Sequence, residues 1–345
     1  MTEGAAPALR APALMRARRM LERLILSEYL VLLLTAAYVL ALCPLVPEIL
    51  QLDTWLDILG AMMPLAVVAI GQTFVLIVGG IDLAAPAILA MASVVGASVM
   101  TGDGGLLAGS SLATPGGILA FLAVGGLIGL FNGLCVTRLR MPPFIVTLTA
   151  MMFFAGAALW YTFLLTDDGS SFGNLPGSFV AIGESGMYGV RYSLLIAGAI
   201  AILAHLVLSR TVFGRWLYAI GLNSRTAEIS GVPVRRAVLG AFVISGLLAA
   251  VASILYTGRI ETGTPVLGQR ILLDIVGSAI IGGVSLFGGK GKIAWTVYGA
   301  LFLTVVDKGL QLLGLSIASV FAIKGSVILL AAVIDATRHR ILVRR

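Results

Sequence analysis

The side chains with the greatest chemical potential are charged groups set deep in long apolar stretches: Asp307, Lys308 and Lys324. A lysine near the centre of a bilayer costs about 2.5–3.5 kcal/mol on insertion scales, so it usually faces a charged partner or a wet cavity. We therefore expect Asp307 and Lys324 to form an ion pair between two helices. A proton or ion relay through these groups is the functional alternative, but one acid with one or two lysines gives it little support.

Other polar side chains interrupt the apolar stretches and could contact a polar solute that crosses a membrane. The residues predicted to lie along such a translocation pathway are Gln72, Asp82, Asn132, Asp274, Ser285 and Lys324. The amides of Gln72, Asn132 and Gln311 could equally form hydrogen bonds between neighbouring helices. Both interpretations stay open from the sequence alone.

The remaining reactive residues do not support enzyme or metal chemistry. His205 and His339 are isolated, and no nucleophile, base and acid stand at the spacing of a catalytic motif. The two cysteines, Cys43 and Cys135, define neither a disulfide framework nor a metal site. The sequence therefore predicts that the chain is not an enzyme and holds no metal or cofactor.

The stretch 282–292 places glycines before a lysine, as phosphate-binding loops do, but its spacing is wrong. The motif G-x-x-x-x-G-K-[ST] needs Ser or Thr after the lysine, and here Gly291 follows Lys290. Apolar stretches flank the segment, and no strand precedes it. We do not expect this chain to hydrolyse ATP by itself.

The amino-acid composition indicates that the chain is embedded in a membrane. The chain has 345 residues, of which 59% are hydrophobic and 11% are charged, and its mean hydropathy is +1.06. Soluble domains carry about 25% charged residues, so this composition indicates an integral membrane protein. The net charge of +7 is spread over the termini and short connections. That distribution fits the positive-inside rule and argues against a nucleic-acid-binding surface.

A spanning helix needs about 20 mostly apolar residues, and the chain offers ten candidate segments. They are 29–46, 60–79, 86–101, 116–137, 144–165, 191–208, 237–256, 272–288, 293–313 and 315–335. With ten crossings the basic connections fall on one side, which places both termini in the cytoplasm. The predicted fold class is an all-α polytopic membrane protein, with the short third and eighth segments broken, tilted or re-entrant. Glycines within the segments, such as Gly125 and Gly129, fit close helix packing.

Three regions follow from this topology. Residues 1–28 form a basic cytoplasmic segment, residues 29–335 the transmembrane domain, and residues 336–345 a basic cytoplasmic tail. We expect the first span to remain uncleaved, because its apolar run is too long for a signal peptide and no cleavage site follows it. Stretch 13–28 is either an amphipathic helix on the membrane surface or only a topology signal.

The segment Gly79–Leu83, followed at once by Pro86, is a strong helix breaker. A break at membrane depth is tolerated where it is buried in protein or lines a cavity. Alternatively, the segment is a short cytoplasmic turn in which Asp82 is solvated or caps the next helix. The sequence favours neither interpretation.

The longest polar and basic segment, 209–236, lies between two apolar segments and carries residues that fit a bilayer interior poorly. A loop of this length and polarity, held at the membrane face, is suited to docking a partner outside the lipid. The sequence therefore indicates a membrane protein whose energy source is another subunit.

Four segments resemble the permease subunits of sugar ABC importers of the ribose, xylose and arabinose type. They are GQTFVLIVGGIDLAAPAILA at 71–90, RMPPFIVTL at 140–148, GRWLYAIGLNSRTAEISGV at 214–232 and GSAIIGGVSLFGGKGKIAWTVYGALF at 277–302. With the final span, the likeness covers most of residues 55–335. The chain departs from the family pattern at 84–86, 257–270 and 307–308, which leaves the particular sugar open.

The resemblance implies a bacterial inner-membrane permease that imports a small polar solute, such as a monosaccharide or polyol. It also implies a cytoplasmic ATPase subunit, a periplasmic solute-binding protein and a second permease subunit, expected to be a copy of this chain. The family's coupling segment, which would seat in a groove on the ATPase, corresponds to Gly221, Asn223, Arg225, Ala227, Glu228 and Gly231. Two other classes stay open: a secondary transporter that uses Asp307 and Lys324 to couple to an ion gradient, and a membrane scaffold or receptor.

Overall fold

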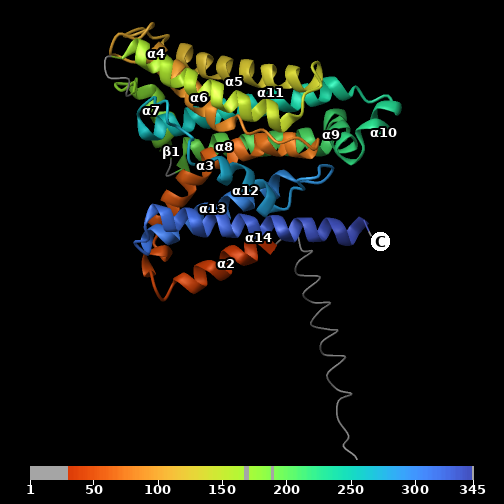
Figure 1. Ribbon diagram of the computed structural model, residues 1–345. Coiled ribbons are helices and arrows are strands. Elements are labelled where there is room, and N and C mark those ends of the chain that lie inside the picture. The colour runs from red at the N-terminus through yellow and green to blue at the C-terminus, as the bar shows by residue number, and fades with distance from the viewer. Residues whose placement is uncertain (1–29, 167–170, 188–189, 344–345) are drawn as a thin grey trace, which may run out of the picture.

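The computed structural model describes residues 30–166, 171–187 and 190–343, and nearly all of its regular structure is helical (Figure 1). In chain order the helices are α2 (Leu30–Leu42), the 3₁₀ helix η1 (Pro47–Leu50), α3 (Leu52–Ile77), α4 (Ala85–Met100), α5 (Ala113–Thr137), α6 (Pro143–Leu165), α7 (Gly177–Glu184), α8 (Tyr192–Arg210), α9 (Val212–Leu222), α10 (Ser224–Ile229), α11 (Val234–Ile260), α12 (Leu272–Gly282), α13 (Ile293–Leu312) and α14 (Ile317–Val343). Strands β1 (Gly186–Met187) and β2 (Val190–Arg191) form an antiparallel hairpin, with Gly186 opposite Arg191 and Met187 opposite Val190. The predicted cytoplasmic segment 1–28 lies outside the described residues.

Each of the ten apolar segments predicted from the sequence contains a helix. In the described part of the chain, six helices are long and apolar enough to cross a membrane: α3, α5, α6, α8, α11 and α13. Shorter apolar helices occupy the other predicted segments, namely α2, α4, α12 and the part of α14 from Ile317 to Val333. The all-α polytopic membrane fold is confirmed, whereas the number of crossings stays a prediction. Since α14 runs on to Val343, the predicted tail 336–345 begins inside a helix.

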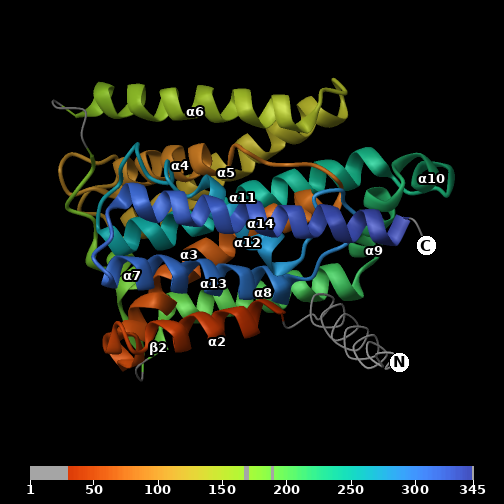
Figure 2. The same cartoon turned by 60° about the horizontal axis from the view of Figure 1, so that its bottom comes forward.

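Helix α3 is the centre of the bundle. Every residue from Met62 to Ile77 is buried, and α8, α11, α12 and α13 all pack against this helix. Helix α6, in contrast, lies along one edge (Figure 2) and exposes large apolar side chains such as Met152 and Phe153. A buried central helix and an apolar periphery are expected when the solvent is lipid.

Helices α5 and α11 approach each other closely because glycines line their contact. A Cβ added to Gly246 of α11 would overlap the carbonyl oxygen of Gly125. A Cβ added to Gly129 would lie 2.6 Å from the carbonyl oxygen of Phe242. Small residues let helix backbones meet in lipid, where packing rather than the hydrophobic effect drives association. The close packing expected from these glycines is confirmed.

Helices α3 and α12 end at glycines with left-handed backbone angles. Helix α3 ends at Ile77, and Gly79 follows with a φ of +79°; α12 ends at Gly282, and Gly283 has a φ of +107°. Glycine adopts these angles without steric cost, so the chain can leave each helix sharply. The predicted eighth segment, 272–288, is therefore helical only as far as Gly282.

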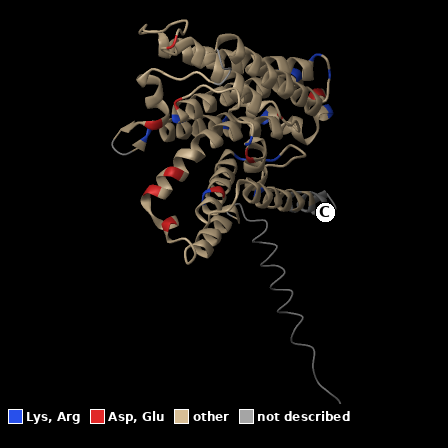
Figure 3. Ribbon diagram, turned by 60° about the vertical axis from the view of Figure 1, so that its left-hand side comes forward, with Lys and Arg blue, Asp and Glu red and all other residues tan. Residues whose placement is uncertain are grey.

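Acidic residues concentrate at the end of the bundle where α3 begins, and basic residues lie at the end that carries α9 and α10 (Figure 3). The acidic end includes Asp53 and Asp57 in the first turns of α3, with Lys308 at 3.3 Å from Asp57. The opposite end includes Arg215 of α9 and Arg225 of α10. This distribution is the one that a cytoplasmic α9–α10 segment would require, and the orientation stays a prediction.

We expect Gly246→Ala to destabilise the protein, because the new methyl group would force α5 away from α11. Overpacking of a tight contact typically costs ~1–3 kcal/mol. The thermal unfolding midpoint of the purified chain in mild detergent should fall by several degrees. Gly156→Ala on α6 is the matched control, since its Cβ would meet nothing within 4 Å. Equal midpoints for the two variants would contradict the packing argument.

Candidate functional site

Two short helices, α9 and α10, occupy the polar segment that was expected to form a loop. Each begins with a side-chain cap: Thr211 Oγ1 accepts from the Gly214 N–H at 3.1 Å, and Asn223 Oδ1 accepts from the Thr226 N–H at 2.9 Å. Thr and Asn at these positions are ordinary helix-start signals, so the sequence contained the signal that would have revealed both helices. The caps fix where α9 stops and α10 starts.

Helix α10 presents a mixed charged and apolar surface outside the bundle. Ala227 is buried and anchors the helix, while Arg225 and Glu228 are exposed. Two large apolar side chains beside them, Leu222 and Ile229, are 76% and 82% exposed. Exposed apolar residues ringed by charges are typical of a protein-docking site. We name Leu222, Asn223, Arg225, Glu228 and Ile229 the α10 surface.

Gly231 ends the α10 turn with a φ of +83°. Its N–H donates to the carbonyl of Glu228 at 3.0 Å, and the N–H of Val232 donates to the carbonyl of Ala227 at 3.0 Å. Any side chain at this position would be strained by the positive φ. Gly231 therefore shapes the return to α11, and nothing lies within 4 Å of where its Cβ would be.

The end of α9 is packed directly on two helix breaks through glycines. A Cβ on Gly221 would overlap the carbonyl oxygen of Ile77 and the backbone nitrogen of Gly289. The N–H of Gly289 donates to the carbonyl of Ile77 at 2.9 Å. A Cβ on Gly288 would lie 3.0 Å from the nitrogen of Gly79 and 3.1 Å from the carbonyl oxygen of Gly221. We name Gly79, Gly221, Gly288 and Gly289 the glycine junction.

A tyrosine adds a second link between α9 and the loop before α13. Tyr218 Oη donates to the carbonyl oxygen of Gly291 at 2.7 Å. Burial raises the pKa of the Tyr218 phenol above its ordinary value, so the group keeps its proton at neutral pH. The α10 surface is thus tied to the ends of α3 and α12 and to the start of α13.

Asp82 is fully buried inside the break between α3 and α4. Its Oδ2 accepts from Ser245 Oγ of α11 at 2.8 Å, and its Oδ1 accepts from the Ala84 N–H at 3.0 Å. The amide of Gln72, oriented to satisfy both backbone groups of Asp82, accepts from its N–H at 3.2 Å and donates to its carbonyl at 2.9 Å. Asp82 is therefore not solvated, although Gly79 in the same break is exposed, and the alternative in which Asp82 caps the next helix stays open.

Two other predicted pathway residues stand apart. Asn132 of α5 is completely buried, and neither its side-chain nitrogen nor its oxygen has a hydrogen-bond partner among the described residues. Ser285 lies in the turn after α12, where its Oγ accepts from the Phe287 N–H at 3.2 Å. The structure brings Gln72 together with Asp82, but not with Asn132 or Ser285.

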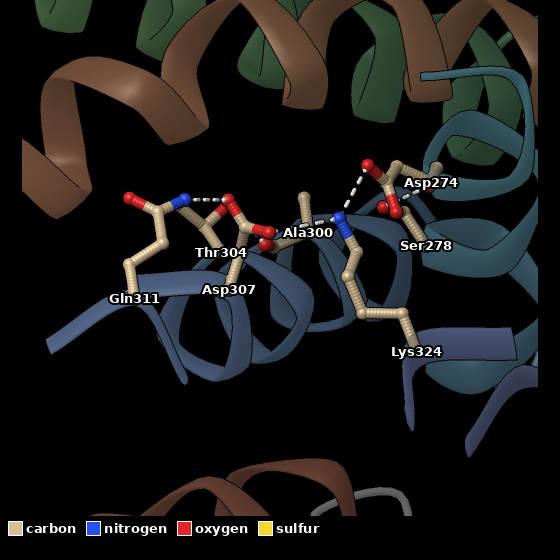
Figure 4. Close-up of polar contacts among 7 residues, drawn as sticks. All are labelled: Asp274, Ser278, Ala300, Thr304, Asp307, Gln311 and Lys324. Carbon is tan, nitrogen blue, oxygen red and sulfur yellow. Dashed lines mark hydrogen bonds and ion pairs between the residues drawn. The ribbon is translucent and has the colours of Figure 1, made fainter. Parts of the chain in front are cut away.

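Lys324 of α14 lies between two carboxylates from different helices (Figure 4). Its Nζ is 2.7 Å from Asp274 Oδ2 of α12 and 3.2 Å from Asp307 Oδ1 of α13. Gln311 Nε2 donates to the other oxygen of Asp307 at 2.8 Å. The predicted pair of Asp307 with Lys324 is confirmed. Sequence reasoning missed that Asp274 is the nearer partner, although an acid inside an apolar stretch is a signal for one.

Two cavities lie beside the charge triad of Asp274, Asp307 and Lys324. The larger has a volume of about 500 Å³ and is lined by Arg270, Ile271, Asp274, Asp307, Gln311, Leu315, Ile317, Val320, Phe321 and Lys324. The smaller, about 340 Å³, shares Arg270, Asp274, Phe321 and Lys324 with it. A few convergent polar groups beside apolar and aromatic walls are typical of small-molecule sites.

Comparison with known families gives one match that covers most of the chain. The family is described as "Branched-chain amino acid transport system / permease component", and it matches residues 54–333. No solved structure matches the chain.

Several curated proteins are similar to the chain over most of their length. The ribose import permease protein RbsC of Bacillus subtilis (strain 168) is 34% identical over 286 residues, which cover 81% of this chain and 84% of the relative. The galactose/methyl galactoside import permease protein MglC of Haemophilus influenzae is 30% identical over 320 residues, covering 90% and 94%. The fructose import permease protein FrcC of Rhizobium meliloti is 32% identical over 272 residues, covering 78% and 74%.

We expect Lys324→Met to lower stability strongly, because it leaves the carboxylate of Asp274 buried without its cation. Breaking a buried ion pair from one side typically costs ~3–5 kcal/mol. The unfolding midpoint in detergent should fall sharply, and the double variant Lys324→Met/Asp274→Asn should recover part of the loss. A double variant less stable than Lys324→Met would contradict a structural ion pair.

Proposed function

The chain belongs to the family of permease components of branched-chain amino acid transport systems, and from this premise we propose that it is the membrane subunit of an ABC importer for a monosaccharide or polyol. The resemblance found in the sequence motifs is confirmed at the level of the family. The relatives named above, for ribose, galactose and fructose, support a sugar over an amino acid. In this proposal the chain performs no covalent chemistry and needs no cofactor, because a partner hydrolyses the ATP.

The proposed topology has ten crossings of the bacterial inner membrane with both termini in the cytoplasm. Residues 29–335 form the transmembrane domain, 209–236 the cytoplasmic coupling segment, and 1–28 and 336–345 the basic cytoplasmic ends. The basic residues near α9 and α10 support this orientation, since cytoplasmic connections carry an excess of Lys and Arg. The four shorter apolar helices must then cross, or partly cross, with the help of their neighbours.

One observation supports the coupling role above all: the α10 surface is exposed, yet its base is fixed to the transmembrane helices through the glycine junction. A cytoplasmic ATPase that binds Asn223, Arg225 and Glu228 would displace α9 when it moves, because Asn223 directly follows this helix. Because Gly221 packs against backbone atoms of Ile77 and Gly289, that displacement would move the end of α3 together with the loop between α12 and α13. The helices would then shift between inward- and outward-open arrangements.

For the solute, we propose that the larger cavity beside the charge triad is a weak contact point. Asp307 and Gln311 offer an acceptor and an amide to sugar hydroxyls, and Phe321 offers an apolar face. Asp274 and Lys324 front the same cavity. The other predicted pathway residues, Gln72, Asp82, Asn132 and Ser285, would reach a solute only if the helices around the breaks rearrange.

The partners in this proposal are three. A cytoplasmic ATPase binds the α10 surface, a periplasmic binding protein delivers the solute, and a second permease subunit, expected to be a copy of this chain, completes the pathway. Selection of the solute rests largely with the binding protein. The contacts between this chain and the solute can therefore be weak. They must be weak enough to release the solute, because a residue along a conduction path cannot retain what passes it.

One observation favours a second candidate, an ion-coupled secondary transporter. The side chain of Lys324 is 8% exposed and lies between two carboxylates, and buried charged groups of this kind often mark ion pathways in transporters. The same arrangement serves equally well as a structural link between α12, α13 and α14. The two functions make opposite predictions for Asp307.

We expect Glu228→Arg to release the ATPase from the complex. In this proposal the ATPase groove favours the carboxylate of Glu228 and would repel an arginine. The Glu228 side chain is exposed and makes no hydrogen bond or ion pair with the described residues that the change would break. Tagged chain purified from native membranes in mild detergent should carry at least about tenfold less phosphate-releasing activity, equivalent to ~1.4 kcal/mol. Glu184→Arg, an exposed acid at the end of α7, is the matched control. Equal ATPase recovery with Glu228→Arg and wild type would refute the coupling role.

We expect Asp307→Asn to keep most of the ATP-driven uptake of radiolabelled ribose, galactose or fructose, whichever the wild type imports. The amide oxygen of Asn can still accept from Lys324, its NH2 can donate to the oxygen of Gln311 once the Gln311 amide turns over, and Asp274 still balances the lysine. Uptake abolished by Asp307→Asn, with normal folding and an intact ATPase complex, would favour the ion-coupled transporter.

A further inference from the structure

A small cavity lies where strand β2 leads into helix α8, at the end of the bundle away from α10 (Figure 2). Its volume is about 70 Å³. It is lined by Leu56, Leu59, Gly60, Met63, Val190, Arg191, Ser193 and Leu194. One wall therefore comes from α3, and the other comes from β2 and the first turn of α8. We name this cavity the arginine pocket.

Two guanidinium groups converge on the glycine in the wall of this pocket. A Cβ added to Gly60 would overlap Nη1 of Arg191, and it would lie 3.5 Å from Nη1 of Arg259 in the last turn of α11. Both nitrogens therefore lie close to a single point, and no side chain at position 60 separates them. Two like charges held this near each other repel, and an anion in contact with both would relieve the repulsion.

The acidic residues around the two arginines balance their charge only in part. Within the described part of the chain, Asp57 alone forms an ion pair with either guanidinium, and its Oδ1 lies 4.0 Å from Nη2 of Arg191. The other oxygen of Asp57 is 3.3 Å from Nζ of Lys308. Arg259 forms no ion pair with any described residue. Arg191 and Lys308 thus share one carboxylate, and the cluster keeps a net positive charge.

A buried hydroxyl in the same pocket also lacks a partner. Ser193 lines the pocket and is 3% exposed, yet its Oγ makes no hydrogen bond with any described residue. Buried polar side chains in folded proteins nearly always have a hydrogen-bond partner, so an exception needs an explanation. A ligand that accepts a hydrogen bond from this hydroxyl would supply one.

Helix α8 begins at the pocket with backbone donors that the helix cannot satisfy. The first N–H groups of an α-helix have no intrahelical acceptor, and no side chain caps α8. The Tyr192 N–H donates to the carbonyl of Ser185 at 3.0 Å, whereas the N–H groups of Ser193 and Leu194 have no acceptor among the described residues. The positive end of the helix dipole adds to the charge of Arg191 at the N-cap. Together these donors favour an oxyanion.

The position of the pocket indicates what carries the oxyanion. Helix α8 is long and apolar enough to cross a membrane, so its first turn lies in the headgroup layer. Leu194 and Leu195 in this turn are 36% and 50% exposed, and Ile202 and Leu203 further along are 63% and 61% exposed. An apolar surface therefore runs from the pocket along α8. A phosphate that carries acyl chains would cover this surface, whereas a free anion would not.

We propose that the arginine pocket binds the phosphate of an anionic phospholipid, such as phosphatidylglycerol, with its acyl chains lying along α8. The planar guanidinium matches phosphate with two parallel hydrogen bonds. The excess of cations disfavours a headgroup that carries its own ammonium, such as phosphatidylethanolamine. The bound lipid would link α3, α8 and α11 at this end of the bundle. The proposal requires only that α8 crosses a membrane, and it holds whichever solute is carried.

Native mass spectrometry of the full-length chain in mild detergent counts the bound lipids and ranks their affinities. One copy of phosphatidylglycerol should bind more tightly than phosphatidylethanolamine. Arg191→Gln and Arg259→Gln should each weaken its binding by about fivefold. Ser193→Ala should also weaken it severalfold. Because this change removes an unpartnered buried hydroxyl, the lipid-free variant should unfold no earlier than the parent, which keeps the test valid even where an arginine variant unfolds early.

The matched control is Arg270→Gln, an exposed arginine in the loop between α11 and α12 that does not line the arginine pocket. It should bind phosphatidylglycerol like the parent. Soluble glycerol phosphate should not displace the lipid, and displacement at equal concentration would show a site for free anions instead. Equal binding of the two lipids, or an equal loss with Arg270→Gln, would overturn the proposal. So would full binding after both pocket arginines are replaced, which would leave an acidic protein partner as the candidate occupant.

Discussion

Backbone polar groups within a membrane must find partners inside the protein, and this constraint governs the whole arrangement of the bundle. The chain leaves its helices after α3 and again after α12, at two glycine-rich breaks. Asp82, Gln72 and Ser245 satisfy the first break, and the hydrogen bond between Gly289 and Ile77 ties the second break to the first. The two breaks are thereby joined, and α9 packs over both.

Whether these contacts are made by backbone or by side-chain atoms decides how well they transmit a displacement. Side chains can change rotamer and absorb a small displacement, but the glycine junction is built from backbone atoms at van der Waals distance. A movement of α9 therefore passes to α3 and to the loop before α13 with little loss. The caps at Thr211 and Asn223 fix the starts of α9 and α10 next to this contact.

The sequence predicts those features that depend on residues close together in the chain, and it does not predict contacts between distant segments. Apolar length located a helix in each of the ten predicted segments, small residues indicated the contact of α5 with α11, and two unbalanced charges indicated the pairing of Asp307 with Lys324. The proximity of Asp274 to Lys324 and of Gly221 to Gly289 depends on segments far apart in the chain, which periodicity cannot relate. The prediction of a loop at 209–236 overlooks α9 and α10 for another reason. It rests on polarity alone, although Thr211 and Asn223 are residues typical of helix starts.

The charge triad and the residues that line its cavities come from the stretch 269–328, whereas the α10 surface comes from one short stretch that ends before α11. Each of the two regions is contiguous in the gene and they do not overlap. A recombination event between α11 and α12 could therefore transplant one region into a relative while leaving the other intact. Under the proposed function, related permeases can therefore change the solute that they bind and still dock the same ATPase subunit.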